Sequence, residues 1–201
     1  FHWSQLKLDS ALSLRGHAHY AQTYNYAAHE IEARLVEGAM GLAYRPLGPR
    51  RFIFLTKYTK RFEQRPVDLT RALPEAEESD VFSVVPVLEL PRGFQWVEKL
   101  ALKRSALKVG PAPVTVHYSL LALTRLNYHL TRTWDAALEH RVLIGTFSAL
   151  THQGVAAEID YIVKDAVRIG LGYNLSAISD DEFANLDERH GGPFVRVTGQ
   201  Y

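Results

Sequence analysis

Two histidines spaced two residues apart are the first candidates for chemistry in this sequence. His17 and His19 lie in an alternating segment, so in a β-strand both side chains point to one face, a spacing that can hold a metal. A zinc site needs three or four converging ligands, and the sequence places no third ligand beside them. We therefore interpret them as histidines bonded to neighbours or water, and we expect no metal and no cofactor.

Carboxylates gather in or directly after two segments that we expect to be loops, 64–79 and 179–192. The first set is Glu75, Glu77, Glu78 and Asp80, and the second is Asp180, Asp181, Glu182, Asp187 and Glu188. Clustered carboxylates can bind calcium or divide acid and base roles in a hydrolase. Their spacing matches no calcium loop, and neither a glycine-rich phosphate loop nor G-x-S-x-G occurs. We interpret both sets as solvated charge and predict no catalytic residue and no enzymatic activity.

A third set of charged residues alternates in sign along successive segments of the C-terminal half. Its members are Arg125, Glu139, Arg141, Glu158, Asp160, Arg168 and Arg196. If these segments are neighbouring strands, opposite charges on one face can pair laterally. If these strands close into a barrel of about ten, its interior has little spare room, and the set then predicts a lumen plugged by ion pairs. A narrow selective pore lined by the same residues is the alternative.

The elements that would position these residues are strands, because apolar and polar residues alternate with period two along most of the chain. The alternating segments are 6–20, 37–45, 52–63, 82–90, 94–103, 117–128, 134–144, 155–161, 167–174 and 195–201. Short connections at 46–50, 91–93, 131–133 and 163–165 alternate with long ones at 21–29, 64–79, 105–113, 147–153 and 179–192. This pattern predicts an all-β, antiparallel up-and-down barrel of about ten strands that forms one domain over residues 1–201.

Aromatic residues on the apolar parity favour a transmembrane barrel over a soluble, lipocalin-like one. They lie within a few residues of a short turn or of the C-terminus, where an interfacial girdle is expected. The girdle residues are Tyr44, Trp96, Tyr128, Trp134, Tyr161 and Tyr201. Repeated full charges on the other parity suit a wet or ion-paired lumen and would be costly in a dry core.

Composition excludes several other classes of protein. The chain has 201 residues, 47% of them hydrophobic, with ordinary numbers of glycine and proline, which excludes a disordered or collagenous chain. Its 23 basic and 22 acidic residues give a net charge of +1, which argues against a nucleic-acid partner. The absence of cysteine excludes disulfides and thiolate chemistry.

Four segments resemble known outer-membrane sequences. The last ten residues, GPFVRVTGQY, resemble the C-terminal signal read by the barrel-assembly machinery, through Phe194, Val195, Val197, Gly199 and Tyr201. RIGLGYNL (168–175), with the acidic segment that follows it, resembles the barrel domain that closes many large bacterial cell-surface and repeat proteins. GLAYRPLG (41–48) and RLNYHLTRTWD (125–135) are similar to the internal strand–turn–strand units of that domain.

This resemblance implies an integral protein of a Gram-negative outer membrane that needs no cofactor and serves as a translocated or anchoring domain. We expect an anchor or scaffold for surface or periplasmic material or for a larger complex. The expected partners are outer-membrane lipid and lipopolysaccharide, the assembly machinery during insertion, and proteins that meet the loops or the N-terminal side. An even strand number would put both chain ends and the short turns in the periplasm. The alternatives are a narrow pore for small solutes or ions and an outer-membrane hydrolase or acyltransferase.

Overall fold

The computed structural model describes residues 2–26, 29–46, 52–66, 73–145, 151–163, 167–175 and 192–199. These residues form one antiparallel sheet of eleven strands. The strands are β1 (His2–Lys7), β2 (Leu12–Asn25), β3 (Glu30–Tyr44), β4 (Phe52–Arg65), β5 (Glu75–Glu89), β6 (Phe94–Val109), β7 (Thr115–His129), β8 (Trp134–Gly145), β9 (Thr151–Val163), β10 (Val167–Asn174) and β11 (Gly192–Gly199). A single 3-10 turn, Pro91–Gly93, joins β5 to β6.

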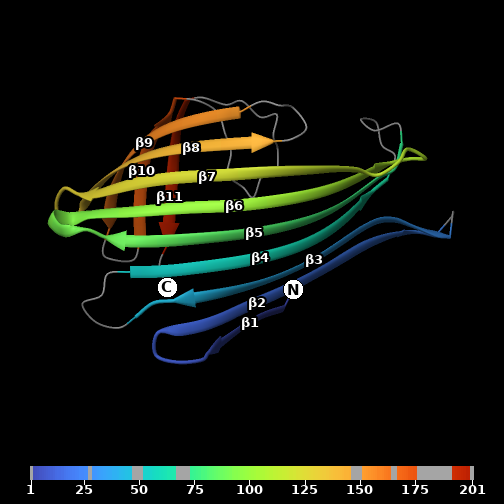
Figure 1. Ribbon diagram of the computed structural model, residues 1–201, viewed down its shortest axis with the longest axis horizontal. Helices are drawn as coiled ribbons and strands as arrows, with labels where there is room; N and C mark the ends of the chain where they lie inside the picture. The colour runs from blue at the N-terminus through green and yellow to red at the C-terminus, as the bar shows by residue number, and fades with distance from the viewer. Residues whose placement is uncertain are drawn as a thin grey trace.

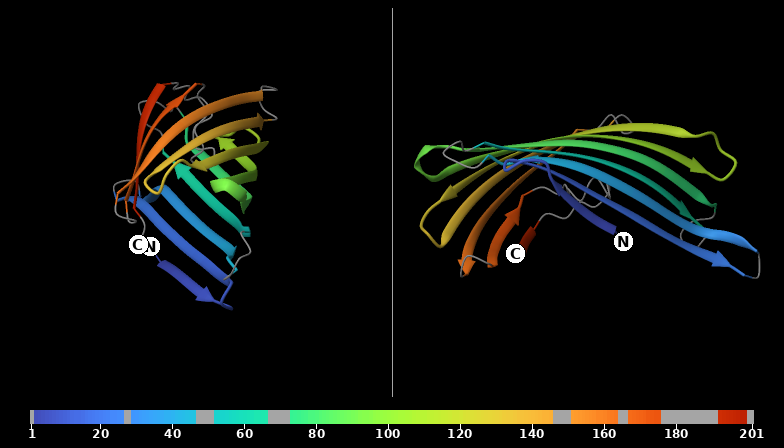
Figure 2. Two further views of the ribbon diagram at one scale, coloured as in Figure 1. Left: turned by 90° about the vertical axis from the view of Figure 1, so that its left-hand side faces the viewer. Right: turned by 90° about the horizontal axis from the view of Figure 1, so that it is seen from below.

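Each strand pairs with its neighbours in sequence, so the order in the sheet is the order in the chain (Figure 1). The sheet curls strongly, and its first and last strands bend toward the same side (Figure 2). Within the described ranges, β1 and β11 form no hydrogen-bonded pair with each other. The all-β, antiparallel, up-and-down prediction is therefore confirmed, whereas the predicted closure into a barrel is not present in this structure.

The prediction of about ten strands is wrong by one, because segment 6–20 contains two strands. Backbone amides of Leu8 and Asp9 donate to the carbonyl of Leu12 and close a tight turn between β1 and β2. In this hairpin each residue faces a partner of the same parity, as Leu6 faces Leu14. The alternation of apolar and polar residues thus passes through the turn without a break, and periodicity alone could not reveal it.

The odd strand number also overturns the expected placement of the chain ends. Because all neighbouring strands are antiparallel, β1 and β11 run in the same direction. The chain therefore enters β1 from the end of the sheet opposite to the one at which β11 finishes. We call the end that carries the connections 8–11, 90–93 and 130–133 the short-turn end, and the opposite end the far end.

The strands are longer at the far end than the hydrophobic pattern predicts. The segment from Glu75 to Asp80, expected as part of an acidic loop, is the beginning of β5, and β2 continues through Asn25. There both faces of the sheet are polar, so the period-two signal disappears although the ladder continues. Cross-strand pairs such as Lys60 with Glu78 take over from apolar contacts.

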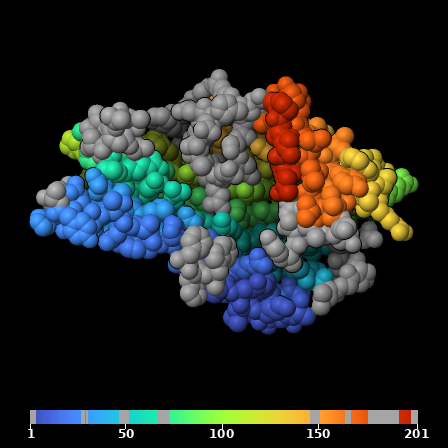
Figure 3. Space-filling model, turned by 180° about the vertical axis from the view of Figure 1, so that it is seen from behind, coloured from blue at the N-terminus to red at the C-terminus, as the bar shows by residue number. Residues whose placement is uncertain are grey.

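The two faces of the sheet differ in kind. The convex face carries most of the exposed large apolar side chains, such as Leu102 at 58% and Leu171 at 64% exposure. The concave face holds the only buried apolar cluster of the described residues, formed by Val81, Ala101, Leu121 and Leu143. Figure 3 views the molecule from the side toward which the sheet curls, with β11 in red. The core is therefore small and lines the inside of the curl.

Candidate functional site: the concave wall

The structure brings the seven charged residues of the C-terminal half together on the concave wall. Arg125 on β7 donates to Glu158 at 2.9 Å and to Glu139 at 3.4 Å. Arg196 on β11 donates to the same Glu158 oxygen at 3.0 Å, and Arg141 pairs with Glu139. Strands β7 to β11 thus contribute to one ion-pair network, because antiparallel registry places these side chains on one face.

The carboxylates of this network are among the most buried groups described. Asp160 is 2% exposed and Glu158 is 5% exposed. Arg125 and Arg168 each lie 3.8 Å from Asp160. Burial of a charge is tolerated only with close partners, so each of these groups depends on the others for its position.

Gly170 provides the space that the buried carboxylates occupy. A Cβ atom at this position would overlap the Asp160 carboxylate and would lie 2.5 Å from Glu158 Oε1. Gly170 is opposite Asp160 in the β9–β10 register, so the carboxylates fold over a strand that has no side chain there. A larger residue would displace both acids from the arginines.

Asp135 is a further member of the network and was not among the residues predicted from the sequence. Its carboxylate is 3.0 Å from Arg168 and lies 2.6 Å from His129 Nδ1, which donates to it when that nitrogen carries a proton. With Asp135, four arginines face four carboxylates, since Glu139, Glu158 and Asp160 supply the other three. Its parity in β8 is that of Glu139, and this signal could have identified it.

The concave wall of β1 to β4 is built differently. His17 contacts Glu37 at 3.0 Å, an acid–base pair that becomes an ion pair when the imidazole is protonated. His19 shares this parity, as its spacing predicted, but the described residues contain no group of three or more His, Asp or Glu that could hold a metal. Toward the short-turn end, Arg15, Arg45 and Lys57 line one cavity.

At the far end, the concave face carries a further set of ion pairs on β4. Glu63 accepts hydrogen bonds from Arg65 at 2.7 Å and from Arg61 at 2.6 Å. The hydrogen bond from Arg65 is the main reason that the pKa of the Glu63 carboxyl lies below its usual range. Nearby, Glu77 accepts from Ser105 at 3.1 Å and lies 3.9 Å from Lys103. The acids expected in loop 64–79 are therefore strand residues with basic partners.

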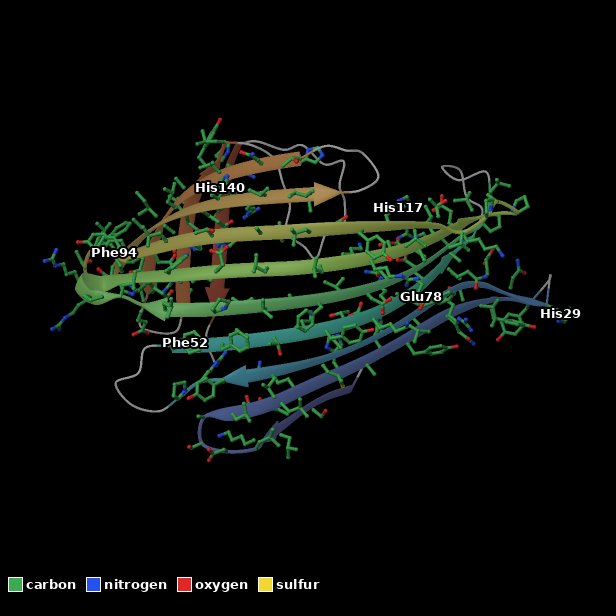
Figure 4. The ribbon with its side chains drawn as sticks, viewed as in Figure 1. His29, Phe52, Glu78, Phe94, His117 and His140 are labelled. Atoms are coloured by element: carbon green, nitrogen blue, oxygen red, sulfur yellow. The ribbon has the colours of Figure 1, made fainter. Side chains whose placement is uncertain are left out.

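Five of the six predicted girdle residues lie on the convex face near the short-turn end. They are Tyr44, Trp96, Tyr128, Trp134 and Tyr161, and the sixth, Tyr201, lies outside the described residues. Phe94 stacks on Tyr128 with ring centroids 4.5 Å apart, and the Trp134 and Tyr161 centroids are 4.9 Å apart. Figure 4 shows Phe52 and Phe94 at this end of the sheet.

The convex face also carries charged residues at the far end, one of which, Glu78, lies in the predicted loop 64–79. Asp80 accepts from Tyr58 at 2.6 Å and from Arg104 at 3.3 Å, and Lys60 donates to Glu78 at 2.6 Å. Glu78 and His117 lie toward the end of the sheet opposite to Phe94 (Figure 4). Apolar side chains on the convex face are thus bounded by aromatic rings at one end and by ion pairs at the other.

One polar group interrupts the apolar part of the convex face. Thr124 on β7 donates to Glu98 on β6 at 2.7 Å, and His140 on β8 is the next residue in the same row. No hydrogen bond among the described residues joins His140 to Thr124 or Glu98. The carboxylate, histidine and hydroxyl that a hydrolase would need do not form a relay here, and the row lies on the strands rather than at a loop rim.

The segment expected to act as an assembly signal forms β11. Phe194 lies opposite Gly172, and its ring occupies the space that a Cβ atom at Gly172 would need. Val195 and Val197 are exposed on the convex face. Gly199 is the last residue of β11, whereas Tyr201 and the acidic set at 180–188 lie outside the described residues.

Comparison with known proteins identifies no family for this chain. Neither a scan against protein-family models nor a search of curated proteins finds a match. No helix of sufficient length and apolarity to span a membrane is found among the residues described.

Proposed function

We propose that this sheet is the wall of an outer-membrane β-barrel that anchors or scaffolds other material at the membrane. One observation carries the proposal: charged side chains are buried inside the curl of the sheet and large apolar side chains are exposed outside it, the reverse of a soluble protein. Carboxylates are buried on the concave wall, with Asp135 at 2% exposure, whereas large apolar side chains such as Leu138, at 56%, are exposed on the convex one. Exposed apolar residues at this density mark a surface that meets lipid or protein.

The dimensions of the strands support the proposal. A transmembrane strand needs about 9–11 residues, and β2 to β9 have 12 to 16. On β7, Tyr118 and Tyr128 both lie on the convex face, ten residues apart in sequence. At about 3.3 Å per residue and a tilt near 40°, this interval spans roughly 25 Å of membrane thickness, close to the apolar band of known barrels.

The proposal requires the open sheet to close. Direct pairing of β1 with β11 would be parallel, whereas bacterial outer-membrane barrels are closed by antiparallel pairs and have an even strand number. Antiparallel closure is available if β11 pairs with β2 and β1 is displaced, or if an odd number of strands from elsewhere joins the two edges. The chain has no cysteine, so a cysteine pair introduced at Leu14 and Val197 can be tested with a short bifunctional maleimide. A cross-link would indicate that β11 pairs with β2, and its absence would indicate that other strands join the two edges.

The Thr124–Glu98 hydrogen bond fits a lipid-facing position only because both partners are paired. An unpaired polar group in an apolar medium costs several kcal/mol, and a hydrogen bond recovers much of that cost. In the proposed barrel, Glu98 would keep Thr124 as its hydrogen-bond partner. His140 in the same row would need a partner as well, whereas the convex rows on either side, Trp96 with Leu126 and Leu100 with Ala122, are apolar.

Arginine substitution at two depths of the convex face tests the membrane assignment. Leu100 on β6 lies opposite Ala122, near the middle of the interval between Tyr118 and Tyr128, whereas Val116 lies at the far end of β7; both are exposed. In a membrane wall, Leu100→Arg should destabilise folding by about 2–4 kcal/mol and Val116→Arg by about 1 kcal/mol or less. The measurement is a reversible urea titration of the protein folded into lipid vesicles.

A soluble protein would respond differently, because exposed positions tolerate arginine within about 0.5 kcal/mol. Equal, small effects at Leu100 and Val116, together with failure of the protein to partition into vesicles, would contradict the membrane wall. Vesicle-bound protein with a protease-resistant body and a large difference between the two variants would support it.

A further inference from the structure

The convex face carries one polar row inside its apolar band. Glu98 on β6, Thr124 on β7 and His140 on β8 form this row, because they are neighbours in the strand register. Thr124 is four residues from Tyr128 and six from Tyr118, so the row lies between the two rings that bound the apolar band. In the proposed membrane wall, lipid headgroups would not reach this depth, since they lie outside the hydrocarbon core.

Two groups in this row have unused hydrogen-bonding capacity. Thr124 donates to Oε2 of Glu98 at 2.7 Å, and no residue that the structure describes donates to Oε1 of the same carboxylate. His140 is exposed, and its imidazole has no hydrogen-bond or ion-pair partner within the described ranges. An imidazole nitrogen that carries a proton donates to a carboxylate oxygen. The row thus contains one unused acceptor and one unused donor that suit each other chemically.

These two groups do not meet within one copy of the chain. Glu98 and His140 lie on the two strands that flank β7, so two strand spacings of about 4.8 Å separate their backbones by roughly 10 Å. Thr124 occupies the position between them and is bonded to Glu98. A partner for the imidazole, and for the second carboxylate oxygen, has to come from beyond the described sheet.

A second copy of the chain can supply both partners at once. In a symmetric dimer, each copy makes the same contact with the other that it receives from it. A two-fold axis along the membrane normal, passing beside Thr124, turns the convex faces of two copies toward each other and exchanges the two sides of β7. Glu98 of each copy then lies beside His140 of the other.

Strand tilt and the neighbouring rows are compatible with this contact. With strands tilted by about 40°, Glu98 and His140 differ in depth by roughly 6 Å, an offset that the two side chains together can span. The adjacent rows present exposed apolar side chains, among them Trp96, Leu126 and Leu100. Apolar side chains around a central polar pair can pack one copy against the other, while the polar pair fixes how the copies are aligned.

We propose that this row is the centre of a symmetric contact between two copies of the chain, in which Glu98 of each copy pairs with His140 of the other. The inference rests on the proposed membrane wall, because polar groups inside a membrane are costly unless they are paired. In water the same groups would be hydrated and would need no partner. A different protein would have to present an acid and a base at matching positions, whereas symmetry places them there in a second copy.

Energy transfer between copies in lipid vesicles tests the proposal. The chain has no cysteine, so Leu130→Cys, in the turn between β7 and β8, provides one site for donor or acceptor dye. Dilution with lipid gives the apparent dissociation constant of the dimer, and flotation of the same vesicles reports whether the protein enters the membrane. Protein that inserts without energy transfer overturns the dimer and leaves the membrane wall intact. Protein that does not insert overturns both.

Leucine substitutions locate the contact. Glu98→Leu and His140→Leu should each weaken association at least tenfold, because each removes both pairs of a symmetric dimer. Both variants should still insert, since leucine is favourable in a lipid-facing position. Thr56→Leu is the matched control, because Thr56 is a polar residue in the convex row of Leu100, outside the polar row, and its loss should leave the dissociation constant unchanged. Equal dissociation constants in the native protein and in both row variants would overturn the proposal.

Exchanged side chains decide whether the partner is a second copy. Glu98→His leaves two histidines in the row and His140→Glu leaves two acids, so neither variant should associate with itself as the native protein does. Mixed together, the two variants should associate about as tightly as the native protein, because each histidine then meets an acid on the other copy. Self-association of both single variants at the native level, or no transfer in the inserted mixture, would overturn the proposal. If an exchanged side chain prevents insertion, the leucine variants still decide the question.

Discussion

Two groups of strands in the sheet, β7 to β11 and β2 to β4, place basic residues on the concave face but surround them with different neighbours. On β7 to β11, arginines alternate with buried carboxylates, and Gly170 makes room for the acids of the chain itself. On β2 to β4, Arg15 and Lys57 flank Gly41, which contributes no side chain to the row. A glycine in the wall thus makes room for buried carboxylates in one region and separates two basic residues in the other.

The largest expected contrast concerns one arginine from each region. Arg125 contacts three carboxylates, so Arg125→Gln leaves buried acids short of a partner and should destabilise folding by about 3 kcal/mol or more. Arg15 is exposed, so Arg15→Gln should change the free energy of unfolding by less than about 1 kcal/mol. Urea titrations measure both; equal losses would remove the distinction between the regions.

A smaller effect is expected at Gly170. Gly170→Ala places a Cβ where Asp160 and Glu158 now lie, and should cost about 1–3 kcal/mol through displacement of the two acids. In the background of Glu158→Gln, which has already weakened the network, the same substitution should cost less. Additive losses in this double-mutant cycle would show that Gly170 acts through the backbone and not through the carboxylates.

Salt should act on the two regions with different strength. Screening acts more strongly on an exposed charge such as Arg15 than on the buried pairs of Glu158. Raising sodium chloride from about 0.05 to about 0.5 M should therefore reduce the stability difference between Arg15→Gln and the native protein by a few tenths of a kcal/mol, while the cost of Arg125→Gln changes little. Equal salt slopes would place both regions in the same dielectric environment.

The smallest effect concerns the pH dependence of Glu63, which lies at the far end, beyond the row that Tyr118 marks as the edge of the apolar band. Its pKa is lowered mainly by the hydrogen bond from Arg65, so its stabilising contribution is complete above the pKa of an unfolded glutamate and is lost as pH falls through the folded value. Arg65→Gln should raise the pKa of Glu63 and should reduce stability at pH 7 more than at pH 3. NMR titration of the carboxyl carbon measures the shift, and an unchanged pKa would contradict the assigned cause.

Much of the fold followed from local alternation, and the errors have a common origin. The faces of β4 to β11 were predicted because successive side chains in a strand point to opposite sides, a property of the backbone alone. The hairpin at Leu8–Ala11 was missed because Leu6 and Leu14 face each other with equal parity, so the pattern passes through the turn. The far end of β5 was missed because charged pairs, rather than apolar residues, line it.

In the candidate site, too, the sequence predicted which face each residue lies on but not which partner it meets. Parity puts Arg125, Glu139, Glu158 and Asp135 on one face, but only registry shows that Asp135 meets Arg168, which lies two strands away. Likewise, the spacing of Arg15, Gly41 and Lys57 in the sequence does not predict that they are neighbours. Strand registry places them in one row.

The sequence by itself determined which residues share a face, because the direction of each Cβ is set by its own strand. Only the tertiary structure decided which charges meet, where a glycine leaves space, and that the two edge strands run in the same direction. These properties depend on the register and number of strands, and both are fixed by hydrogen bonds between residues far apart in the chain.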